Sequence, residues 1–102
     1  MTFDPPKKLY AVTNGTRLDG ARCFKTPAAA QQMAKRYHAR GEASQIIPLT
    51  DVIYEQRWYV VYILTAESFV VFKRQSVADR ESLAALKAGR DCVICVYSRE
   101  LI

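Results

Sequence analysis

Short apolar runs, separated by glycines and polar residues, follow one another along most of the chain. Lys8–Thr13 and the segment TRLDGARCF flank Asn14-Gly15, a dipeptide that readily takes the two positive φ angles of a tight type I′ turn. Together they predict a β-hairpin. Four later runs are rich in β-branched and aromatic residues and predict further strands: SQIIPLTDVIYEQ, RWYVVYILT, SFVVFKRQ and CVICVYS.

Two segments between these runs carry helix signals at their ends. In KTPAAAQQMAKRYHARG, Thr26 can cap the first turn, Pro27 suits the first helical position and Gly41 supplies a left-handed stop. In SVADRESLAALKAGRD, Ser76 followed three residues later by an aspartate resembles a capping box, and Gly89 ends the helix. The sequence therefore predicts two helices, each followed by a strand.

The two halves of this pattern resemble each other. LYAV at residues 9–12 matches WYVV at 58–61, and Phe-Lys at 24–25 matches Phe-Lys at 72–73. A one-residue gap keeps these anchors aligned. The element order is then ββαβ-ββαβ, which indicates an internal duplication.

The length of the chain suits one hydrophobic core. We expect a single α+β domain over residues 1–102, with a flexible N-terminus at 1–7. Its architecture would be an antiparallel-rich sheet of five or six strands with two helices, in a ferredoxin-like two-layer arrangement. Such an arrangement covers one face of the sheet with helices and leaves the other open.

Charge is unevenly distributed along the sequence. The formal net charge is +5, but residues 7–41 hold eight lysines and arginines against Asp19 alone, so this segment carries +7 and the rest carries −2. A basic segment of this kind attracts an acidic protein surface or nucleic acid, and the alternative is a solvated face that keeps a small protein soluble.

The three cysteines do not form a recognisable site. An odd number fits a reducing compartment, so we expect a cytoplasmic protein. Cys92 and Cys95 lie three residues apart in a predicted strand, where their side chains face opposite ways. With no second pair, and with Cys23 and His38 poorly spaced for zinc, we expect buried thiols, no metal and no cofactor.

Several function classes are disfavoured by missing patterns. No uninterrupted apolar run approaches the roughly 20 residues of a membrane span, and MTFDPPKKLY lacks the apolar core of a secretory signal. Glycine-rich phosphate loops and paired carboxylates at a telling spacing are absent as well. We therefore expect a non-catalytic protein that does not associate with membranes.

The remaining signal points to binding. In RWYVVYILT both faces of the strand are apolar, so an open sheet would expose one of them, unless the strand is central and its second face is covered. The expected function is binding of a partner macromolecule, most simply a protein, through this aromatic face and the basic flank. The candidate partner-binding residues are Trp58, Tyr62, Lys35, Arg36 and Arg40.

Three alternatives use the same features. A second copy of the chain could cover the apolar face and form a homodimer. Aromatic residues beside basic ones could bind single-stranded RNA or DNA. The third alternative is a small-molecule-binding regulatory domain, or an enzyme whose motif is not recognisable, which a metabolite would stabilise thermally.

Overall fold

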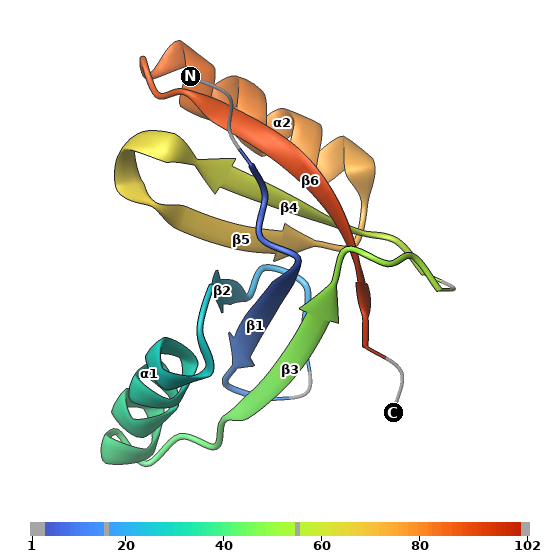
Figure 1. Cartoon of the computed structure of the whole chain (residues 1–102). Coiled ribbons are helices and arrows are strands. Elements are labelled where there is room, and N and C mark those ends of the chain that lie inside the picture. The colour runs from blue at the N-terminus through green and yellow to red at the C-terminus, as the bar shows by residue number, and fades with distance from the viewer. Residues whose placement is uncertain (1–3, 16, 55, 101–102) are drawn as a thin grey trace.

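The structure is a computed structural model that describes residues 4–15, 17–54 and 56–100, and its strands form a closed barrel (Figure 1). The elements in chain order are β1 (Lys8–Thr13), β2 (Arg22–Phe24), α1 (Pro27–Ala39), β3 (Gln45–Thr50), β4 (Trp58–Ile63), a 3₁₀ turn (Leu64–Ala66), β5 (Ser68–Phe72), α2 (Gln75–Lys87) and β6 (Cys92–Arg99).

Closure of the sheet corrects the expected architecture. The strands follow the order β1-β2-β5-β4-β6-β3 around the barrel, and all neighbours are antiparallel. The ferredoxin-like two-layer arrangement is therefore wrong. In each half the first strand is central: β1 lies between β2 and β3, and β4 lies between β5 and β6. The flanking strands join the halves, because β2 pairs with β5 and β3 pairs with β6. No open sheet face is left among the described strands.

The two halves have matching strand registers. Tyr10 lies opposite Phe24 in the first half, and Tyr59 lies opposite Phe72 in the second. Both helices contain 13 residues, and α2 begins 48 positions after α1. The same alignment that matches the sequence anchors therefore also matches the strand pairs and the helices.

The halves are joined at two short seams, the β2·β5 and β3·β6 strand pairs, and both follow the same correspondence between the two halves. The β2·β5 seam includes the pair Arg22 and Val70, and the β3·β6 seam includes the pair Thr50 and Ser98. The two residues of each pair are 48 positions apart, so each residue pairs with its own counterpart. An approximate two-fold axis consequently passes through both seams.

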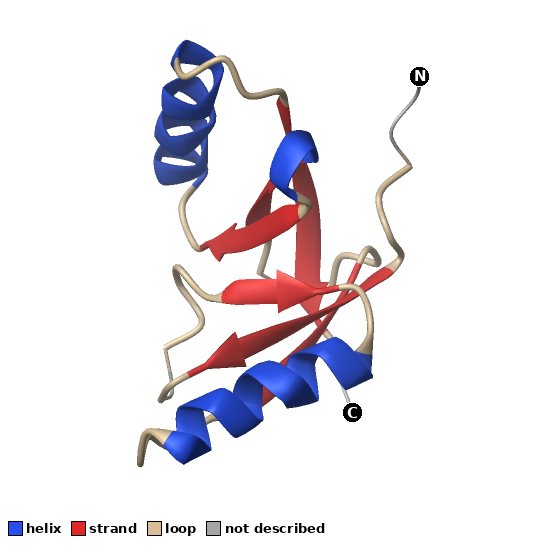
Figure 2. Ribbon diagram, turned by 90° about the vertical axis from the view of Figure 1, so that its left-hand side faces the viewer, coloured by secondary structure: helices blue, strands red, loops and turns tan. Residues whose placement is uncertain are grey.

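The core fills the barrel, and the helices lie outside it (Figure 2). Side chains that alternate along the strands form one interior cluster, whose largest members include Leu9, Leu49, Trp58, Phe69 and Tyr97. Val12 and Val61 are buried outside this cluster, because α1 packs against β1 and α2 packs against β4. Each central strand is thus buried on both of its faces.

The segment before β1 contacts the barrel. The hydroxyl of Tyr97 donates a hydrogen bond to the carbonyl of Pro6, and the backbone N–H of Asp51 donates to the carbonyl of Lys7 at 3.0 Å. The flexible N-terminus expected at residues 1–7 lies partly outside the described residues, because the structure describes the chain from Asp4.

Two local predictions about turns and caps are wrong. Asn14-Gly15 does not form a two-residue turn, because β2 begins only at Arg22 and the connecting loop inserts the buried side chain of Leu18 into the core. Ser76 is not a cap, because α2 already begins at Gln75, and Arg74 precedes the helix without a side-chain hydrogen bond to it.

Both helices end as predicted, on a glycine in the left-handed region. Gly41 has φ +77° and Gly89 has φ +78°. The N–H of Gly89 donates to the carbonyl of Leu86, and the next N–H, of Arg90, donates to Ala85. This is the Schellman pattern that satisfies the last carbonyls of a helix.

Replacing Gly89 with alanine is expected to lower the free energy of unfolding by about 1–2 kcal/mol, because alanine is strained at this φ. Gly15→Ala is the matched control, since Gly15 is exposed and has no left-handed φ. Urea denaturation of both variants would check the difference, and equal changes would contradict the assigned backbone strain.

Candidate functional site

The two aromatic residues predicted to bind a partner face the barrel interior. Trp58 is 8% exposed and Tyr62 is 5% exposed. The ring of Tyr62 stacks on that of Phe69, with centroids 4.2 Å apart and planes 19° apart. Because the sheet closes, the open aromatic face that the sequence pattern predicts does not exist. Trp58 also lines a surface hollow, together with Arg17 and Lys73.

The three basic residues predicted to bind a partner lie on α1. Lys35, Arg36 and Arg40 are exposed. The guanidinium of Arg40 lies 5.3 Å from the ring centroid of Tyr37, and its Nε lies 3.7 Å from the carboxylate of Glu42. Arg40 is therefore partly neutralised, whereas Lys35 and Arg36 present their charge on the helix surface away from Trp58 and Tyr62.

A second basic surface follows the β2·β5 seam, where three shallow hollows adjoin one another. The largest, about 540 Å³, is lined by Arg17, Leu18, Asp19, Trp58, Lys73, Arg74 and Val77. It shares Arg17 and Asp19 with the middle hollow, which in turn shares Arg22 with the third. We call this region the seam surface and define it by its five exposed cations: Arg17, Arg22, Lys25, Lys73 and Arg74.

The outer two hollows are counterparts in the two halves. Lys25 lines one and Lys73 lines the other, 48 positions later. A carboxylate accompanies each lysine, Glu67 in the first case and Asp19 in the second, and these acidic residues are also 48 positions apart. The approximate two-fold axis thus places two similar basic hollows on either side of Arg22.

Short-range contacts orient Arg22 and Lys25 and fix the backbone at Lys73. Oδ1 of Asp19 accepts a hydrogen bond from the backbone N–H of Lys73 at 3.0 Å, which ties the β1–β2 loop to the end of β5. Nζ of Lys25 lies 5.8 Å from the ring centroid of Phe69, and the guanidinium of Arg22 lies 5.7 Å from that of Phe24. These cation–π contacts orient the cations over aromatic rings.

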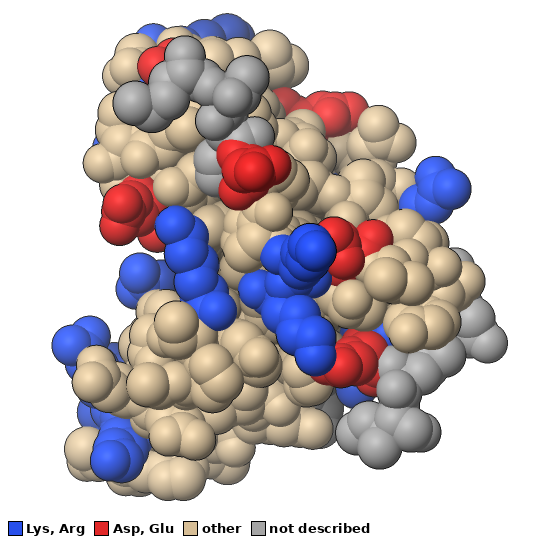
Figure 3. All heavy atoms as spheres, viewed as in Figure 1, with Lys and Arg blue, Asp and Glu red and all other residues tan. Residues whose placement is uncertain are grey.

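The seam surface is only partly visible in the sequence. Arg17, Arg22 and Lys25 belong to the basic segment 7–41, but Lys73 and Arg74 come from the part of the chain with net negative charge. Pairing of β2 with β5 brings them together. The face drawn in Figure 3 carries lysine and arginine side chains across its middle, and aspartate and glutamate side chains lie among them.

The three cysteines pack in the core or contact neighbouring elements. Burial raises the pKa of Cys23 to about 12, and burial also raises the pKa of Cys95. Cys95 packs against the interior, whereas Sγ of Cys92 lies 3.0 Å from Oγ of Ser82 on α2. The two thiols therefore lie on opposite faces of β6, as strand alternation predicts.

Grouped metal ligands and membrane-spanning helices are absent from the described residues. His38 Nε2 lies 2.9 Å from Oγ of Ser44 on the surface. Within residues 4–15, 17–54 and 56–100, no three His, Cys, Asp or Glu side chains are grouped so as to hold a metal ion. Neither helix in this part of the chain has the length and apolar composition needed to cross a membrane.

Comparison of the chain with known protein families, with curated proteins and with solved structures finds no match.

Proposed function

We propose that this is a non-catalytic binding protein that recognises an acidic segment of a partner protein along the seam surface. The observation that carries the proposal is the connection of five exposed cations, from both halves of the barrel, by three adjoining hollows. Arginine and lysine side chains pair with carboxylates, and a surface of one charge sign speeds association with a partner of the opposite sign.

The aromatic rings at the seam favour an acidic protein over a single-stranded nucleic acid. Binding of single strands relies on exposed rings on which bases stack. Here the ring of Phe24 lies beneath Arg22, and the rings of Tyr62 and Phe69 stack on each other beneath Lys25. These rings support cations, so the surface offers charge rather than stacking platforms.

The shape of the surface supports weak affinity. The hollows are shallow and the five cations are exposed, so water screens each ion pair and each contributes about 0–1 kcal/mol. Five such pairs along an extended acidic segment contribute at most about 5 kcal/mol, which corresponds to a dissociation constant on the order of a few hundred micromolar. The interaction would be fast and sensitive to salt.

Fluorescence anisotropy with two labelled probes of equal charge tests this function: a glutamate-rich peptide of about 12 residues and a single-stranded RNA of similar charge. We expect the peptide to bind at least as tightly as the RNA, and its affinity to fall about tenfold between roughly 50 and 200 mM salt. A lysine-rich peptide of the same length is the control and should not bind.

Two results would overturn the proposal. Absence of peptide binding at low salt would remove the acidic segment as the ligand. RNA binding far tighter than peptide binding at equal charge would instead favour the nucleic-acid alternative, because the excess affinity would have to come from contacts to bases or sugars.

We further propose that the protein acts in a reducing compartment such as the cytoplasm. The three cysteines are free thiols, which supports this assignment.

A further inference from the structure

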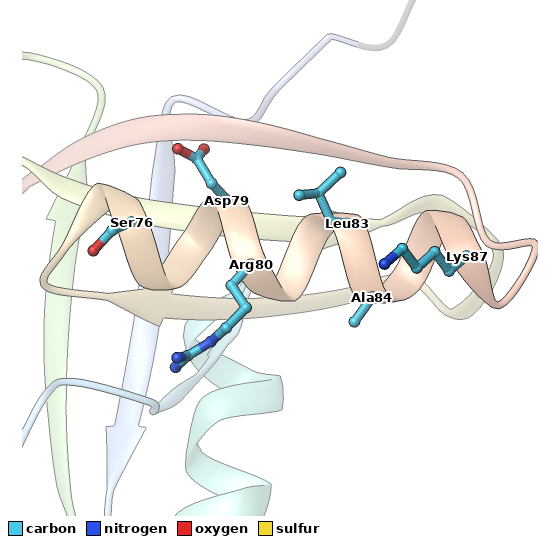
Figure 4. A pocket seen from close by; sticks show the side chains of 6 residues that line it. All are labelled: Ser76, Asp79, Arg80, Leu83, Ala84 and Lys87. Atoms are coloured by element: carbon cyan, nitrogen blue, oxygen red, sulfur yellow. The ribbon is translucent and has the colours of Figure 1, made fainter.

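The outer face of α2 carries apolar side chains that no part of the described chain covers. Leu83 is 57% exposed and Leu86 is 52% exposed. Leu83 lies within a hollowed stripe along the helix whose lining residues are Ser76, Asp79, Arg80, Leu83, Ala84 and Lys87 (Figure 4). An apolar centre between charged ends is the usual composition of a contact surface.

The other half of the barrel shows that the fold does not require these leucines. The positions of α1 that correspond to Leu83 and Leu86, 48 residues earlier, are Lys35 and His38. Both helices have the same length and pack against the central strand of their own half. A lysine and a histidine therefore suffice at these two outward positions, and the leucines on α2 need another explanation.

Two of the three charged residues on the stripe are arranged symmetrically about Leu83. The third, Arg80, has no charged counterpart, because the position three residues after Leu83 is Leu86. Asp79 lies four residues before Leu83 and Lys87 lies four residues after it. The two charged residues are about 12 Å apart along the helix axis. If two α2 helices pack antiparallel with Leu83 at the centre, Asp79 of each copy lies level with Lys87 of the other. Opposite charges then meet twice, as a two-fold interface requires.

We propose that the partner of this face is a second copy of the same chain, bound through an antiparallel pair of α2 helices. In this register Leu83 of each copy would pack against Leu83 of the other, and Leu86 would pack against the aliphatic part of Arg80. Asp79 and Lys87 would set the register and the antiparallel direction. The dimer does not depend on the acidic-segment proposal, because the seam surface is defined by Arg17, Arg22, Lys25, Lys73 and Arg74, none of which lies on the stripe.

The expected dimer is weak. A pair of 13-residue helices covers less than the roughly 1,600 Å² of a standard interface. Only two leucines from each copy supply large apolar contacts. The dissociation constant is therefore expected on the order of 100 µM.

Sedimentation equilibrium of the full chain, from about 10 µM to about 1 mM, tests the dimer. The wild-type protein should pass from monomer toward dimer over this range. The variant L83K/L86H, which gives α2 the residues of α1, should remain monomeric and should keep the wild-type circular dichroism spectrum. A wild-type protein that stays monomeric at the highest concentration would overturn the proposal.

A charge exchange tests the register separately. D79K and K87D should each raise the dissociation constant of the dimer about tenfold, because each places like charges opposite one another twice. The double variant D79K/K87D restores opposite charges and should return to within about threefold of wild type. Failure of the double variant to recover would overturn the antiparallel arrangement.

Binding of the glutamate-rich peptide separates this proposal from the proposed function. L83K/L86H should bind the peptide as the wild-type protein does, since the seam surface is unchanged. Loss of dimer with retained peptide binding supports both proposals. A wild-type dimer that does not bind the peptide supports the dimer and overturns only the acidic-segment function.

Discussion

Trp58→Ala is expected to lower the free energy of unfolding by about 3–5 kcal/mol. Trp58 is a member of the interior cluster, and on β4 it lies opposite Tyr97 of β6, which is also buried. Removing the indole leaves a cavity where the β4·β6 pair meets the core. Domains of this size are stabilised by about 5–15 kcal/mol in total, so the variant would lose a large fraction of its stability.

Urea denaturation followed by circular dichroism measures this loss, because the tryptophan signal disappears in the variant. Trp58→Phe keeps an aromatic ring in the cluster and should cost clearly less. Arg36→Ala, on the exposed surface of α1, should change the free energy of unfolding by less than about 0.5 kcal/mol. A Trp58→Ala protein with wild-type stability and lost peptide binding would contradict the interior role and return Trp58 to the binding surface.

Reversal of the two counterpart lysines is expected to have the largest effect on binding. Lys25→Glu and Lys73→Glu should each weaken binding of the glutamate-rich peptide about tenfold, and the double variant about a hundredfold. Both lysines are exposed, and each lines one of the two corresponding hollows. The approximate two-fold axis makes their contributions similar, so neither single reversal should be dominant.

Anisotropy titrations at two salt concentrations check this expectation, and the salt dependence should weaken in the double variant. The α1 double variant Lys35→Glu/Arg36→Glu is the matched control. It makes the same change in net charge, but on the basic flank predicted from the sequence. It should weaken binding only a fewfold, through the overall field of the protein. A larger loss from the α1 pair than from the seam pair would move the binding surface to α1.

Local signals in the sequence predict the helices well, because their ends are encoded by neighbouring residues. Thr26 caps α1, with its hydroxyl oxygen accepting a hydrogen bond from the N–H of Ala29 at 3.3 Å. Gly41 and Gly89 end the two helices with the predicted left-handed conformation. The start of α2 is predicted less well, because Ser76 offers a cap by composition while the helix begins one residue earlier.

Closure of the barrel cannot be predicted in the same way. It depends on two short seams between distant segments, and the recorded β2·β5 register comprises only two residue pairs. Because side chains alternate between the two faces of a strand, RWYVVYILT shows that both faces of this strand are apolar. It does not show what covers either face. In the structure Trp58 and Tyr62 face the interior while Val61 is buried on the opposite face, toward α2.

The same limit applies to the candidate site. The basic segment 7–41 predicts an acidic partner in general, but it contains only part of the seam surface. Lys73 and Arg74 become neighbours of Arg17 through the hydrogen bond between Asp19 and the backbone of Lys73. A non-local contact therefore completes the surface, and the sequence pattern carries no sign of it.

The approximate two-fold symmetry also has a consequence for the order of the two halves along the chain. Residues 51–57 lead from β3 to β4, and the corresponding gap, from β6 to β1, separates Glu100 from Lys8, whose side chains form an ion pair at 3.1 Å. Joining the chain across this second gap and opening it within 51–57 would leave every strand pair and both helices in place. A circularly permuted chain, with either half first, is therefore expected to form the same barrel.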